Sequence, residues 1–428
     1  DIIGLMLQLK YLREHKEAVL KALEKRNFKG VELIDQLLEL DEVRRKTQTE
    51  LDQQLAEANS LAKEIGQLFK NGEAQKAQGL KERSAALKSS SKDLQELLQE
   101  TEIQLRTLRL QIPNTPKDIV PAGTTEEDNI ETERGGTIPV LSPDALPHWE
   151  LAKKYNLIDF ELGSKITGAG FPVYTGKGAR LQRALINYFL DKNTAAGYQE
   201  TQVPHLVNEL SGYGTGQLPD KEGQMYHVTG DDLYLIPTAE VPLTNIFRDE
   251  LLDEKQLPIC LTGYTPCFRR EAGSYGSHVR GLNRLHQFDK VEIIRLEKPE
   301  RSEAALKEMV DHIRDILIEL EIPYRILRLC AGDLGFTAAL TYDFELFSTA
   351  QDRWLEISSV STFEGFQSER LHLRYKAKDG SKHLVHTLNG SSLALPRVLA
   401  GILENCQTPE GIKIPKALVP YTGFDLIS

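Results

Sequence analysis

The sequence predicts an α+β protein in which an antiparallel helical coiled-coil arm precedes a domain built on a mainly antiparallel sheet flanked by helices. First, residues 35–112 contain no proline and are rich in Leu, Glu, Lys, Gln and Ala, which favour helices. Second, an Asn-Gly turn signal interrupts this stretch at 71–72. Third, strand-like and helical segments follow residue 136 without a regular β–α–β alternation. With 428 residues, the chain has room for two or three domains.

The arm is predicted from apolar residues that recur every three or four positions. One series precedes the turn, at Leu51, Leu55, Ala58, Leu61, Ile65 and Leu68. A second series follows it, at Leu87, Leu94, Leu98, Leu105, Leu108 and Ile112, with Ser91 and Thr101 in its gaps. An average spacing of about 3.5 residues is that of a coiled-coil seam. We therefore expect an arm domain, 1–112, that folds back near 70–73, with limbs of roughly 35 residues extending ~50 Å.

The basic residues of the arm have two interpretations. They are Lys63, Lys70, Lys76, Lys81, Arg83, Lys88 and Lys92. On a spacer or a dimerisation rod they would form a solvated face, whereas a nucleic-acid-binding surface would use them to contact phosphates. The pattern of the arm by itself does not decide between the two.

Beyond the arm, the composition changes twice. Prolines at 113, 116 and 121 and the acidic run 126–128 interrupt every periodic pattern, which predicts a linker over 113–135. The remainder, 136–428, is predicted to be a globular domain. Its clearest strands and helices are expected at 233–236, 291–295, 354–357, 181–190 and 303–320.

The composition excludes several classes of protein. The net charge of −11, from 52 basic and 63 acidic residues, gives no general basicity, so nucleic-acid binding must depend on local patches. The sequence has no apolar run near the ~20 residues needed to cross a bilayer, so we expect no membrane partner. The four cysteines, at 260, 267, 330 and 406, form no C-x-x-C pair, which argues against a zinc site. Residues 1–10 lack a signal-peptide pattern, and a cytoplasmic location is expected.

Two glycine-rich segments look like phosphate-binding loops but lack the required spacing. Around Lys177, the distance from Gly170 is one residue too long for a P-loop, and Gly178 replaces the Ser or Thr that would bind magnesium. Residues 212–216 lack the third glycine and the preceding strand of a dinucleotide-binding loop. We expect a flexible turn at 212–216.

Residues 267–292 form the strongest candidate for a phosphate site. The run Cys267-Phe268-Arg269-Arg270-Glu271 is followed by a small-residue loop, 272–276, and by a return segment, 280–292. This pattern predicts a strand, a loop and a second strand, with Arg269, Arg280 and Arg284 on one side. Clustered guanidinium groups suit a polyphosphate because they form bidentate, charge-assisted hydrogen bonds. A surface network of arginines and carboxylates is equally compatible with the composition.

Two later segments add candidate ligands. Glu356-Ile357-Ser358-Ser359 places two hard oxygen donors, Glu356 and Ser359, near a strand end, and magnesium prefers such donors. Residues 387–397 join a strand to a helix at 398–404, and Arg397 lies at the helix N-terminus, where backbone amides favour anions. An ordinary turn and helix cap would explain this last segment without any ligand.

Taken in order, these segments resemble the seryl-tRNA synthetases, a family of class II aminoacyl-tRNA synthetases, essentially from Leu5 to the C-terminus. The signals are the arm, the linker, Thr238-Ala239-Glu240, the hairpin at 268–292 that resembles class II motif 2, the segment 356–359, and the segment 387–397 that resembles motif 3. Residues 179–204 are similar to motif 1, the dimerisation element. The H-x-G-H and K-M-S-K-S signatures of class I synthetases do not occur in the sequence.

The resemblance implies an activity. A family member uses ATP to activate L-serine as seryl-adenylate, transfers the seryl group to the 3′ end of serine tRNA, requires Mg²⁺ and acts as a homodimer. Whether selenocysteine tRNA is also charged stays open. Because the family's arm recognises the shape of serine tRNA, the basic residues of the arm are now interpreted as phosphate contacts. Two alternatives remain: a ligase that loads an amino acid onto a carrier protein, and a non-catalytic protein that kept the fold.

The resemblance also assigns site residues. The ATP site would contain Arg269, Arg270, Glu271, Arg284, Phe288, Glu356, Ile357, Ser358, Ser359 and Arg397. In the catalytic pair, Arg269 would hold the α-phosphate and the substrate carboxylate, and Arg397 would hold the distal phosphates. Glu271 and Phe288 would bind adenine. Glu356 and Ser359 would bind Mg²⁺.

The serine site implied by the resemblance comprises Thr238, Ala239, Glu240, Arg269, Glu292 and Ser391. Thr238 and Glu240 would meet the ammonium group of serine, and Glu292 and Ser391 its hydroxyl. A pocket whose buried polar groups need that hydroxyl would reject alanine. The chain departs from residues usual in the family at Arg270, Glu369, Ser392 and Pro396. Strand alternation favours Arg269 over Arg270 as the inward-pointing arginine.

Overall fold

The computed structural model describes residues 9–271, 276 and 279–428. The described chain divides into two compact units, one of residues 9–24 and 28–113 and one of residues 25–27 and 114–428. The start of the predicted arm domain, 1–8, and most of the predicted loop at 272–276 lie outside the described residues. Within the part of the chain described, every helix is too short or too polar to span a bilayer.

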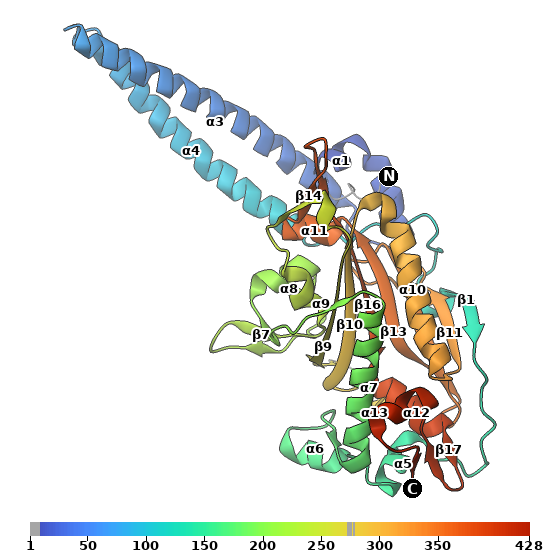
Figure 1. Ribbon diagram of the computed structural model, residues 1–428. Helices are drawn as coiled ribbons and strands as arrows, with labels where there is room; N and C mark the ends of the chain where they lie inside the picture. Colours follow the sequence, from blue (N-terminus) through green and yellow to red (C-terminus); the bar gives the residue numbers. More distant parts are fainter. Residues whose placement is uncertain (1–8, 272–275, 277–278) are drawn as a thin grey trace. The chain divides into compact units, whose positions relative to one another are not determined.

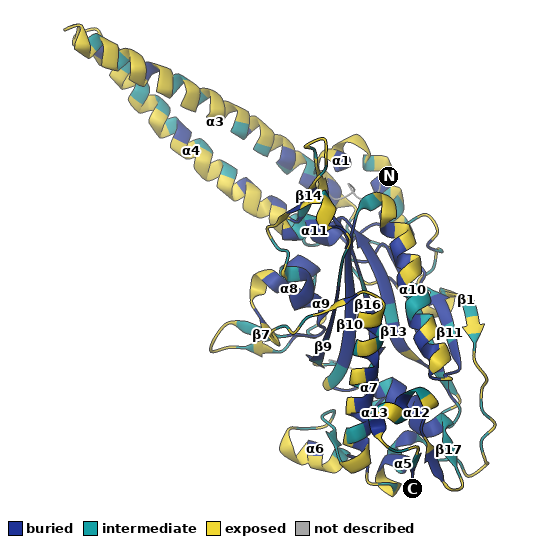
Figure 2. Ribbon diagram, in the orientation of Figure 1, coloured by how far each residue is buried: buried dark blue, intermediate teal, exposed yellow. Residues whose placement is uncertain are grey.

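The first unit is a helical hairpin with a short lead-in. Its helices are α1 (Leu9–Glu14), α2 (Lys16–Lys25), α3 (Glu32–Lys70) and α4 (Ala77–Arg109). Figure 1 shows α3 and α4 running side by side in opposite directions. A narrow stripe of each helix is buried while the rest faces solvent (Figure 2). This burial pattern is the one expected when two amphipathic helices cover each other.

One residue of the predicted seam is misplaced. Leu51 and Leu61 are buried, but Leu55 is 39% exposed. The half-buried Gln54 takes its place, and its Oε1 accepts a hydrogen bond from Ser91 Oγ of α4 at 3.3 Å. The prediction of Leu55 was wrong because the buried or half-buried positions 51, 54, 58 and 61 alternate steps of three and four, which leaves residue 55 one position outside the seam.

A buried carboxylate ties α1 to the base of the hairpin. Asp41 of α3 is fully buried and accepts hydrogen bonds from Arg44 Nη2 at 2.9 Å, from Arg45 Nε at 3.1 Å, and from Arg13 of α1. Burial raises the pKa of Asp41, but the hydrogen bonds from Arg44 and Arg13 more than offset this, so the pKa lies below its usual value. Asp41 therefore stays ionised and holds three arginine side chains.

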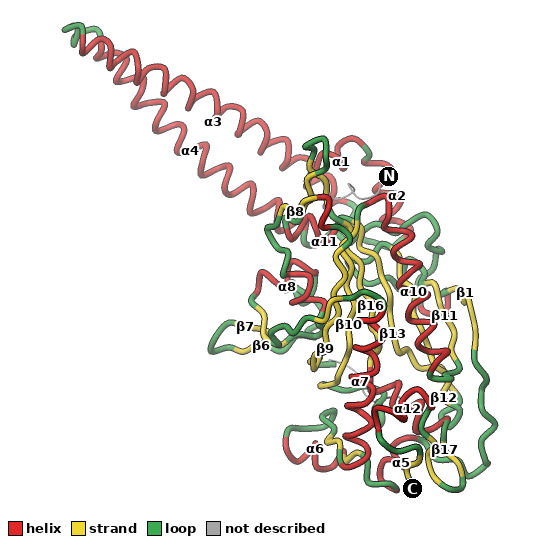
Figure 3. The backbone as a smooth tube through the Cα atoms, in the orientation of Figure 1, coloured by secondary structure: helices red, strands yellow, loops and turns green. Residues whose placement is uncertain are grey.

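The second unit is built on an eight-stranded sheet (Figure 3). Its strands, in spatial order, are β1 (Ile130–Gly135), β11 (Tyr324–Arg328), β12 (Leu340–Ser348), β13 (Arg353–Glu364), β16 (His386–Ala394), β10 (Gln287–Glu297), β9 (Ile259–Phe268) and β4 (Gln199–Glu200). Among the described strands of this sheet, β4 and β9 form the one parallel pair. The prediction of a helical arm and a mainly antiparallel sheet is confirmed.

The segment 113–135, predicted to be a linker, is partly structured. Residues 130–135 form β1, which pairs with β11 at the edge of the sheet. The linker prediction was wrong for these residues because an edge strand needs only one row of backbone hydrogen bonds and tolerates polar, solvent-facing side chains. The sequence Ile-Glu-Thr-Glu-Arg-Gly of β1 is of this kind.

Helices cover one face of the sheet and leave polar groups on the other. The packed helices are α7 (Gly176–Ala195), α10 (Ser302–Glu319) and α12 (Leu395–Asn405). Val291 and Ile293 of β10 are fully buried in the core beneath these helices. Because side chains alternate along a strand, Lys290 and Glu292 face the opposite side. On that side α9 (Glu240–Asn245) and α11 (Phe366–Leu371) pack against the sheet, and α8 (Glu209–Thr215) packs against these two helices.

The predicted flexible turn at 212–216 is instead largely helical, because residues 209–215 form α8. Its glycines serve close packing: a Cβ at Gly212 would lie 2.7 Å from the Leu218 side chain, and one at Gly214 would lie 2.5 Å from that of Leu371. The turn was predicted from glycine content alone, but tertiary packing selects the small residue here.

The remaining elements are short. The helices are α5 (His148–Lys154), α6 (Phe160–Ile166) and α13 (Val419–Thr422). The small sheets are β2 (Ile158–Asp159) with β3 (Val173–Tyr174); β5 (Leu206–Val207), β7 (Leu233–Leu235) and β6 (His227–Val228); β15 (Lys382–Leu384), β14 (Arg374–Lys376) and β8 (Leu251–Asp253); and β17 (Gln407–Thr408), β18 (Gly411–Lys413) and β19 (Leu426–Ile427).

Candidate active site

Strand β10 supplies the centre of the site. Glu292 lies opposite Ser391 of the neighbouring strand β16. Residues directly opposite in an antiparallel pair project from the same face, so the carboxylate and the hydroxyl share one side of the sheet. Both side chains lie on the face opposite α10. The register of two strands therefore brings together residues that are far apart in the sequence.

The carboxylate of Glu292 is buried and only partly satisfied. Its Oε2 lies 2.7 Å from Lys290 Nζ and accepts a hydrogen bond from Thr238 Oγ1 at 3.1 Å. Its Oε1 is buried and has no hydrogen-bond partner among the described residues. Burial raises the pKa of Glu292, although Lys290 opposes the change. The free oxygen is an acceptor suited to a hydroxyl or ammonium group of a ligand.

Glu240 is the second buried carboxylate of the site. Gln367 Nε2 donates to its Oε1 at 2.7 Å, and Thr387 Oγ1 donates to Gln367 Oε1 at 2.7 Å, which fixes the orientation of the amide. Within the described chain, no cation lies at ion-pair distance from this carboxylate. Burial and the neighbouring Glu292 raise the pKa of Glu240 to about 7. Such a carboxylate is suited to a ligand that brings its own positive charge.

The middle residue of the segment 238–240 has a different role. Ala239 is fully buried, and its side chain packs with Leu243, Leu261 and Ile294. The alanine side chain therefore belongs to the core, and only the backbone of Ala239 can face a ligand.

Arg269 is close enough to the two carboxylates and to Arg397 for its charge to act on all three. Its Nε donates to the Pro237 carbonyl at 3.4 Å, and its guanidinium lies 5.3 Å from the centroid of the Phe288 ring. Its charge acts to lower the pKa of Glu240 and of Glu292, and it also contributes to the lowered pKa of Arg397. Arg270, in contrast, is exposed. The geometry agrees with the expectation that Arg269 is the inward-pointing arginine.

Part of the predicted phosphate cluster is engaged in ion pairs. Arg284 Nη1 lies 2.6 Å from Glu271 Oε2, and the Glu271 backbone N–H donates to Gln224 Oε1 at 3.1 Å. Arg280 lies 3.4 Å from Glu150 Oε1, so it does not join Arg269. The arginine–carboxylate network considered as the alternative therefore exists at 271–284, beside the buried site. The connecting residues 272–275 and 277–278 lie outside the described part of the chain.

A β-bulge aligns the two predicted metal ligands. Phe344 of β12 pairs with Ser358, but the next residue, Glu345, pairs with Glu356, so Ile357 is an extra residue on β13. In a regular strand, Glu356 and Ser359 would point to opposite faces. With the bulge, both come close to Asp343, which is hydrogen-bonded to Ser359 and electrostatically coupled to Glu356.

The two residues between these ligands face elsewhere. Ile357 is buried in the main core. Ser358 Oγ donates to the Ser391 carbonyl at 2.6 Å and so positions the β16 residue opposite Glu292. The side chain of Ile357 therefore cannot contact a nucleotide, and Ser358 acts through Ser391.

The donors at the bulge fit a hard cation such as Mg²⁺. In the described chain no three His, Cys, Asp or Glu side chains gather in a metal cage. Magnesium commonly binds one or two protein oxygens and takes its other ligands from water and phosphates, so Glu356 and Ser359 would suffice. Asp343 Oδ1 is buried without a partner among the described residues. Burial and the charge of Glu356 raise the pKa of Asp343 well above its usual value.

Arg397 lies in the first turn of helix α12, and two backbone carbonyls accept hydrogen bonds from it. Its Nε donates to the Asn283 carbonyl at 2.9 Å, and its Nη1 donates to the Glu356 carbonyl at 2.9 Å. Burial lowers the pKa of Arg397, and Arg284 and Arg269 add to this, while Glu356 opposes it. The guanidinium is thus oriented beside the predicted metal ligand Glu356.

Sequence reasoning missed three residues of this site: Lys290, Gln367 and Asp343. Lys290 could have been found, because it lies two residues before Glu292 on one strand and therefore on the same face. Gln367 lies 127 residues from Glu240 in the sequence, and Asp343 lies on β12, opposite Ser359 of β13. Their contacts therefore arise only from the fold.

The comparisons with known proteins define first a class. A family model described as the tRNA synthetase class II core domain (G, H, P, S and T) matches residues 226–406, a range that includes Thr238, Glu240, Arg269, Glu292 and Arg397. A prolyl-tRNA synthetase structure from Giardia lamblia aligns with 63% of the chain at a TM-score of 0.56 and 18% identity, which shows a shared fold. Residues 226–406 therefore match the core domain of the class II aminoacyl-tRNA synthetases.

The family follows from matches to both units. The model of the seryl-tRNA synthetase N-terminal domain matches residues 6–116. The chain is 49% identical to the serine–tRNA ligase of Salinibacter ruber, with 98% of each chain covered. It also superposes on seryl-tRNA synthetase from Pyrococcus horikoshii complexed with ATP, at a TM-score of 0.90, 33% identity, and 98% and 99% coverage. The chain belongs to the seryl-tRNA synthetase family, which confirms the resemblance.

The Lys290–Glu292 pair yields a test of the buried charge. Lys290→Met leaves the Glu292 carboxylate without its cation and raises its pKa further. The variant should lose about 3–5 kcal/mol in free energy of unfolding near pH 8. The loss should shrink toward pH 5. That pH is close to the ordinary Glu pKa of 4.5, so protonating Glu292 in the folded state then costs little free energy. Urea unfolding followed by circular dichroism measures both values.

The double variant Lys290→Met/Glu292→Gln is the control for this test. It removes both charges, so it should regain most of the stability near pH 8. An equal loss for the single variant at both pH values would contradict the assignment of Glu292 as the ionised partner.

Proposed function

We propose that the chain activates L-serine with ATP and charges serine tRNA. In the first step, a serine carboxylate oxygen attacks the α-phosphorus of ATP, the bond to the bridging oxygen breaks, and seryl-adenylate and pyrophosphate form. In the second, a terminal ribose hydroxyl of tRNA attacks the acyl carbon, AMP leaves, and the hydroxyl proton is released. The observation that carries this proposal is Arg269, which packs against Phe288 and whose charge acts on the two buried carboxylates, Glu240 and Glu292, and on Arg397.

Serine would bind over β10. Its ammonium group would meet Glu240 and Thr238, and its hydroxyl would reach Glu292 Oε1 and Ser391. The carboxylate would lie against Arg269, which lowers the electrostatic cost of bringing it to the phosphate. Glu292 would select serine because alanine would leave a buried acceptor unpaired.

ATP would bind along the arginines. Arg269 would stabilise the charge that develops at the α-phosphate, and Arg397 would hold the departing pyrophosphate. Glu271 and Phe288 would bind adenine, with Arg284 beside Glu271 and Arg270 at the exposed rim. Glu356 and Ser359 would hold Mg²⁺, whose charge would neutralise that of the phosphates. The catalytic work of the chain is positioning and electrostatic stabilisation, and no side chain forms a covalent intermediate.

The helical arm would recognise serine tRNA by its shape. Basic residues stand exposed on both of its helices, and contacts to phosphates read shape rather than sequence. We further propose that 1–112 is the tRNA-binding domain, that 136–428 is the catalytic domain, that two copies form a homodimer through 179–204, and that the enzyme works in the cytoplasm.

The amino-acid specificity is tested by ATP–pyrophosphate exchange across a panel of amino acids. Serine should exceed alanine by ~10⁴. Glu292→Gln should lower the serine-dependent rate by roughly 10²-fold while the KM for ATP changes little, because Glu292 contacts serine only. Glu303→Gln, an exposed acid on α10, is the matched control and should behave as wild type. Faster exchange with another amino acid would reject the proposed substrate.

Serine binding should depend on pH through Glu240. Its pKa is raised to about 7 in the free protein, and the incoming ammonium group favours the ionised carboxylate. Binding near pH 7 should therefore release about half a proton, and affinity should increase from about pH 6 to pH 8. Isothermal titration calorimetry in two buffers of different ionisation enthalpy measures the release. Glu240→Gln should bind serine weakly with no such pH dependence, and proton release by this variant equal to wild type would assign the effect elsewhere.

The role of the arm is tested by shortening it. Gln54 and Ser91 are hydrogen-bonded across the hairpin, so residues 55–90 can be replaced by a Gly-Ser-Gly turn without separating the helices. Serine-dependent pyrophosphate exchange should persist within about threefold, while charging of serine tRNA should fall by at least ~10²-fold, as expected when many phosphate contacts are lost. Equal loss of both activities would mean that the arm maintains the catalytic fold instead.

A further inference from the structure

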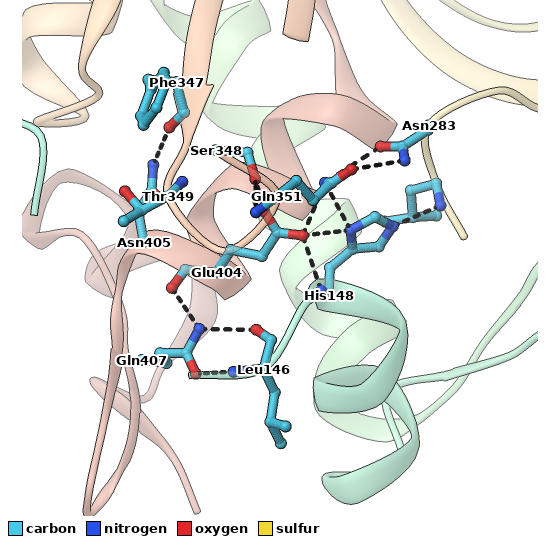
Figure 4. Close-up of polar contacts among 11 residues, drawn as sticks. Leu146, His148, Asn283, Phe347, Ser348, Thr349, Gln351, Glu404, Asn405 and Gln407 are labelled. Atoms are coloured by element: carbon cyan, nitrogen blue, oxygen red, sulfur yellow. Dashed lines mark hydrogen bonds and ion pairs between the residues drawn. The ribbon is translucent and has the colours of Figure 1, made fainter. Parts of the chain in front are cut away.

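His148, Ser348, Gln351 and Glu404 form a largely buried polar cluster that has no role in the proposed binding of serine or ATP. His148 of α5 and Glu404 of α12 are both fully buried. Glu404 Oε1 accepts hydrogen bonds from the His148 backbone N–H at 2.9 Å and from Gln351 Nε2 at 2.9 Å, and it lies 2.7 Å from His148 Nδ1 (Figure 4). Ser348 Oγ donates to the other oxygen. The carboxylate is therefore surrounded by donors.

The hydrogen bonds determine the tautomer of His148. The backbone N–H of Leu282 lies 2.8 Å from His148 Nε2, and a backbone amide can only donate. Nε2 must therefore be unprotonated, so Nδ1 carries the proton and donates it to Glu404. Burial raises the pKa of Glu404, but the contacts from His148 and the hydrogen bond from Ser348 together more than offset this, so the pKa lies below its usual value. His148 is thus a neutral imidazole that donates a hydrogen bond to Glu404 and accepts one from the Leu282 backbone amide.

Asn283, the residue after Leu282, contacts Arg397. Asn283 Nδ2 donates to Gln351 Oε1 at 2.9 Å, while the Asn283 carbonyl accepts from Arg397 Nε at 2.9 Å. Two branches thus run from Glu404 to this loop, one through His148 and one through Gln351 (Figure 4). Arg397 and Glu404 are seven residues apart on α12, about two turns, and so lie on the same side of the helix.

The approach of the loop to His148 leaves no space for a side chain. Gly281 has a φ of +66°, and a Cβ there would lie 2.3 Å from His148 Nε2. Both the backbone conformation and the close contact require glycine. The backbone of Gly281 and Leu282 therefore packs directly against the imidazole of His148.

We propose that His148 is a positioning residue for nucleotide binding: supported by Glu404, it fixes the backbone at 281–283 so that the Asn283 carbonyl orients Arg397 toward the distal phosphates of ATP. The inference rests on the proposed function in one respect, that Arg397 binds ATP. His148 itself touches no substrate. Loss of its bond to Leu282 should weaken ATP binding while leaving serine binding intact, because the serine pocket is formed by β10, β16 and α9.

Two substitutions at His148 separate the two hydrogen bonds of its ring. In His148→Gln, the amide oxygen can take the place of Nε2 and accept from Leu282. In His148→Asn, the amide NH₂ can take the place of Nδ1 and donate to Glu404, but the side chain is too short to reach Leu282. His148→Asn should raise the KM for ATP in serine-dependent pyrophosphate exchange by about tenfold, the effect of one lost hydrogen bond. His148→Gln should stay within about threefold of wild type, and the KM for serine should be unchanged in both.

A second variant tests the other branch without altering the fully buried pair. Gln351→Met removes the donor to Glu404 and the acceptor for Asn283, and it should also raise the KM for ATP without changing that for serine. His372→Gln, at an exposed histidine, is the control and should match wild type. Equal KM values for ATP in His148→Asn and His148→Gln, an unchanged KM for ATP in Gln351→Met, or equal increases for ATP and serine would overturn the inference. Absence of serine-dependent exchange in the wild-type chain would instead reject the proposed function.

Discussion

Strand β10 pairs with β9 on one side and with β16 on the other, and this double ladder of backbone hydrogen bonds determines the geometry of the site. It places Glu292 opposite Ser391. Phe288 lies at the start of β10, where β10 pairs with the end of β9, and Arg269 directly follows β9. A slip of one residue in either pairing would turn the carboxylate of Glu292 into the apolar core and bring Val291 or Ile293 into the pocket. The apolar packing beneath α7, α10 and α12 therefore protects the register on which recognition depends.

The same alternation separates two kinds of environment across one sheet. On the helix-covered face, burial of aliphatic side chains stabilises the fold. On the other face, Glu240 and Glu292 are buried with incomplete partners, which costs free energy in the unliganded protein. A ligand that supplies an ammonium group and a hydroxyl would relieve that cost. Selectivity of this type comes from polar groups that a smaller ligand would leave unpaired, and it requires a rigid frame around them.

Irregular backbone, rather than regular strand, places several of the remaining groups. The extra residue Ile357 turns Glu356 and Ser359 to the same side of β13. Glu271 has a φ of +47°, a conformation that non-glycine residues seldom adopt, at the point where its carboxylate meets Arg284. Gly281 makes possible the contact of the return segment with His148. These departures are local, and each depends on neighbours from other parts of the chain.

Features that depend on nearby residues could be predicted from the sequence: the helical arm, its turn, the mixed strand and helix content of the second unit, and candidate residues such as Arg269 and Glu292. It misjudged Leu55 in the seam, the linker over 130–135 and the turn at 212–216, because burial, edge pairing and close packing at those positions are set by distant partners. The contacts of Glu240 with Gln367, 127 residues away, and of His148 with Glu404, 256 residues away, arise from the fold and could not be predicted. Periodicity and turn signals report short-range geometry, whereas a buried polar group is satisfied by whichever side chain the folded chain brings to it.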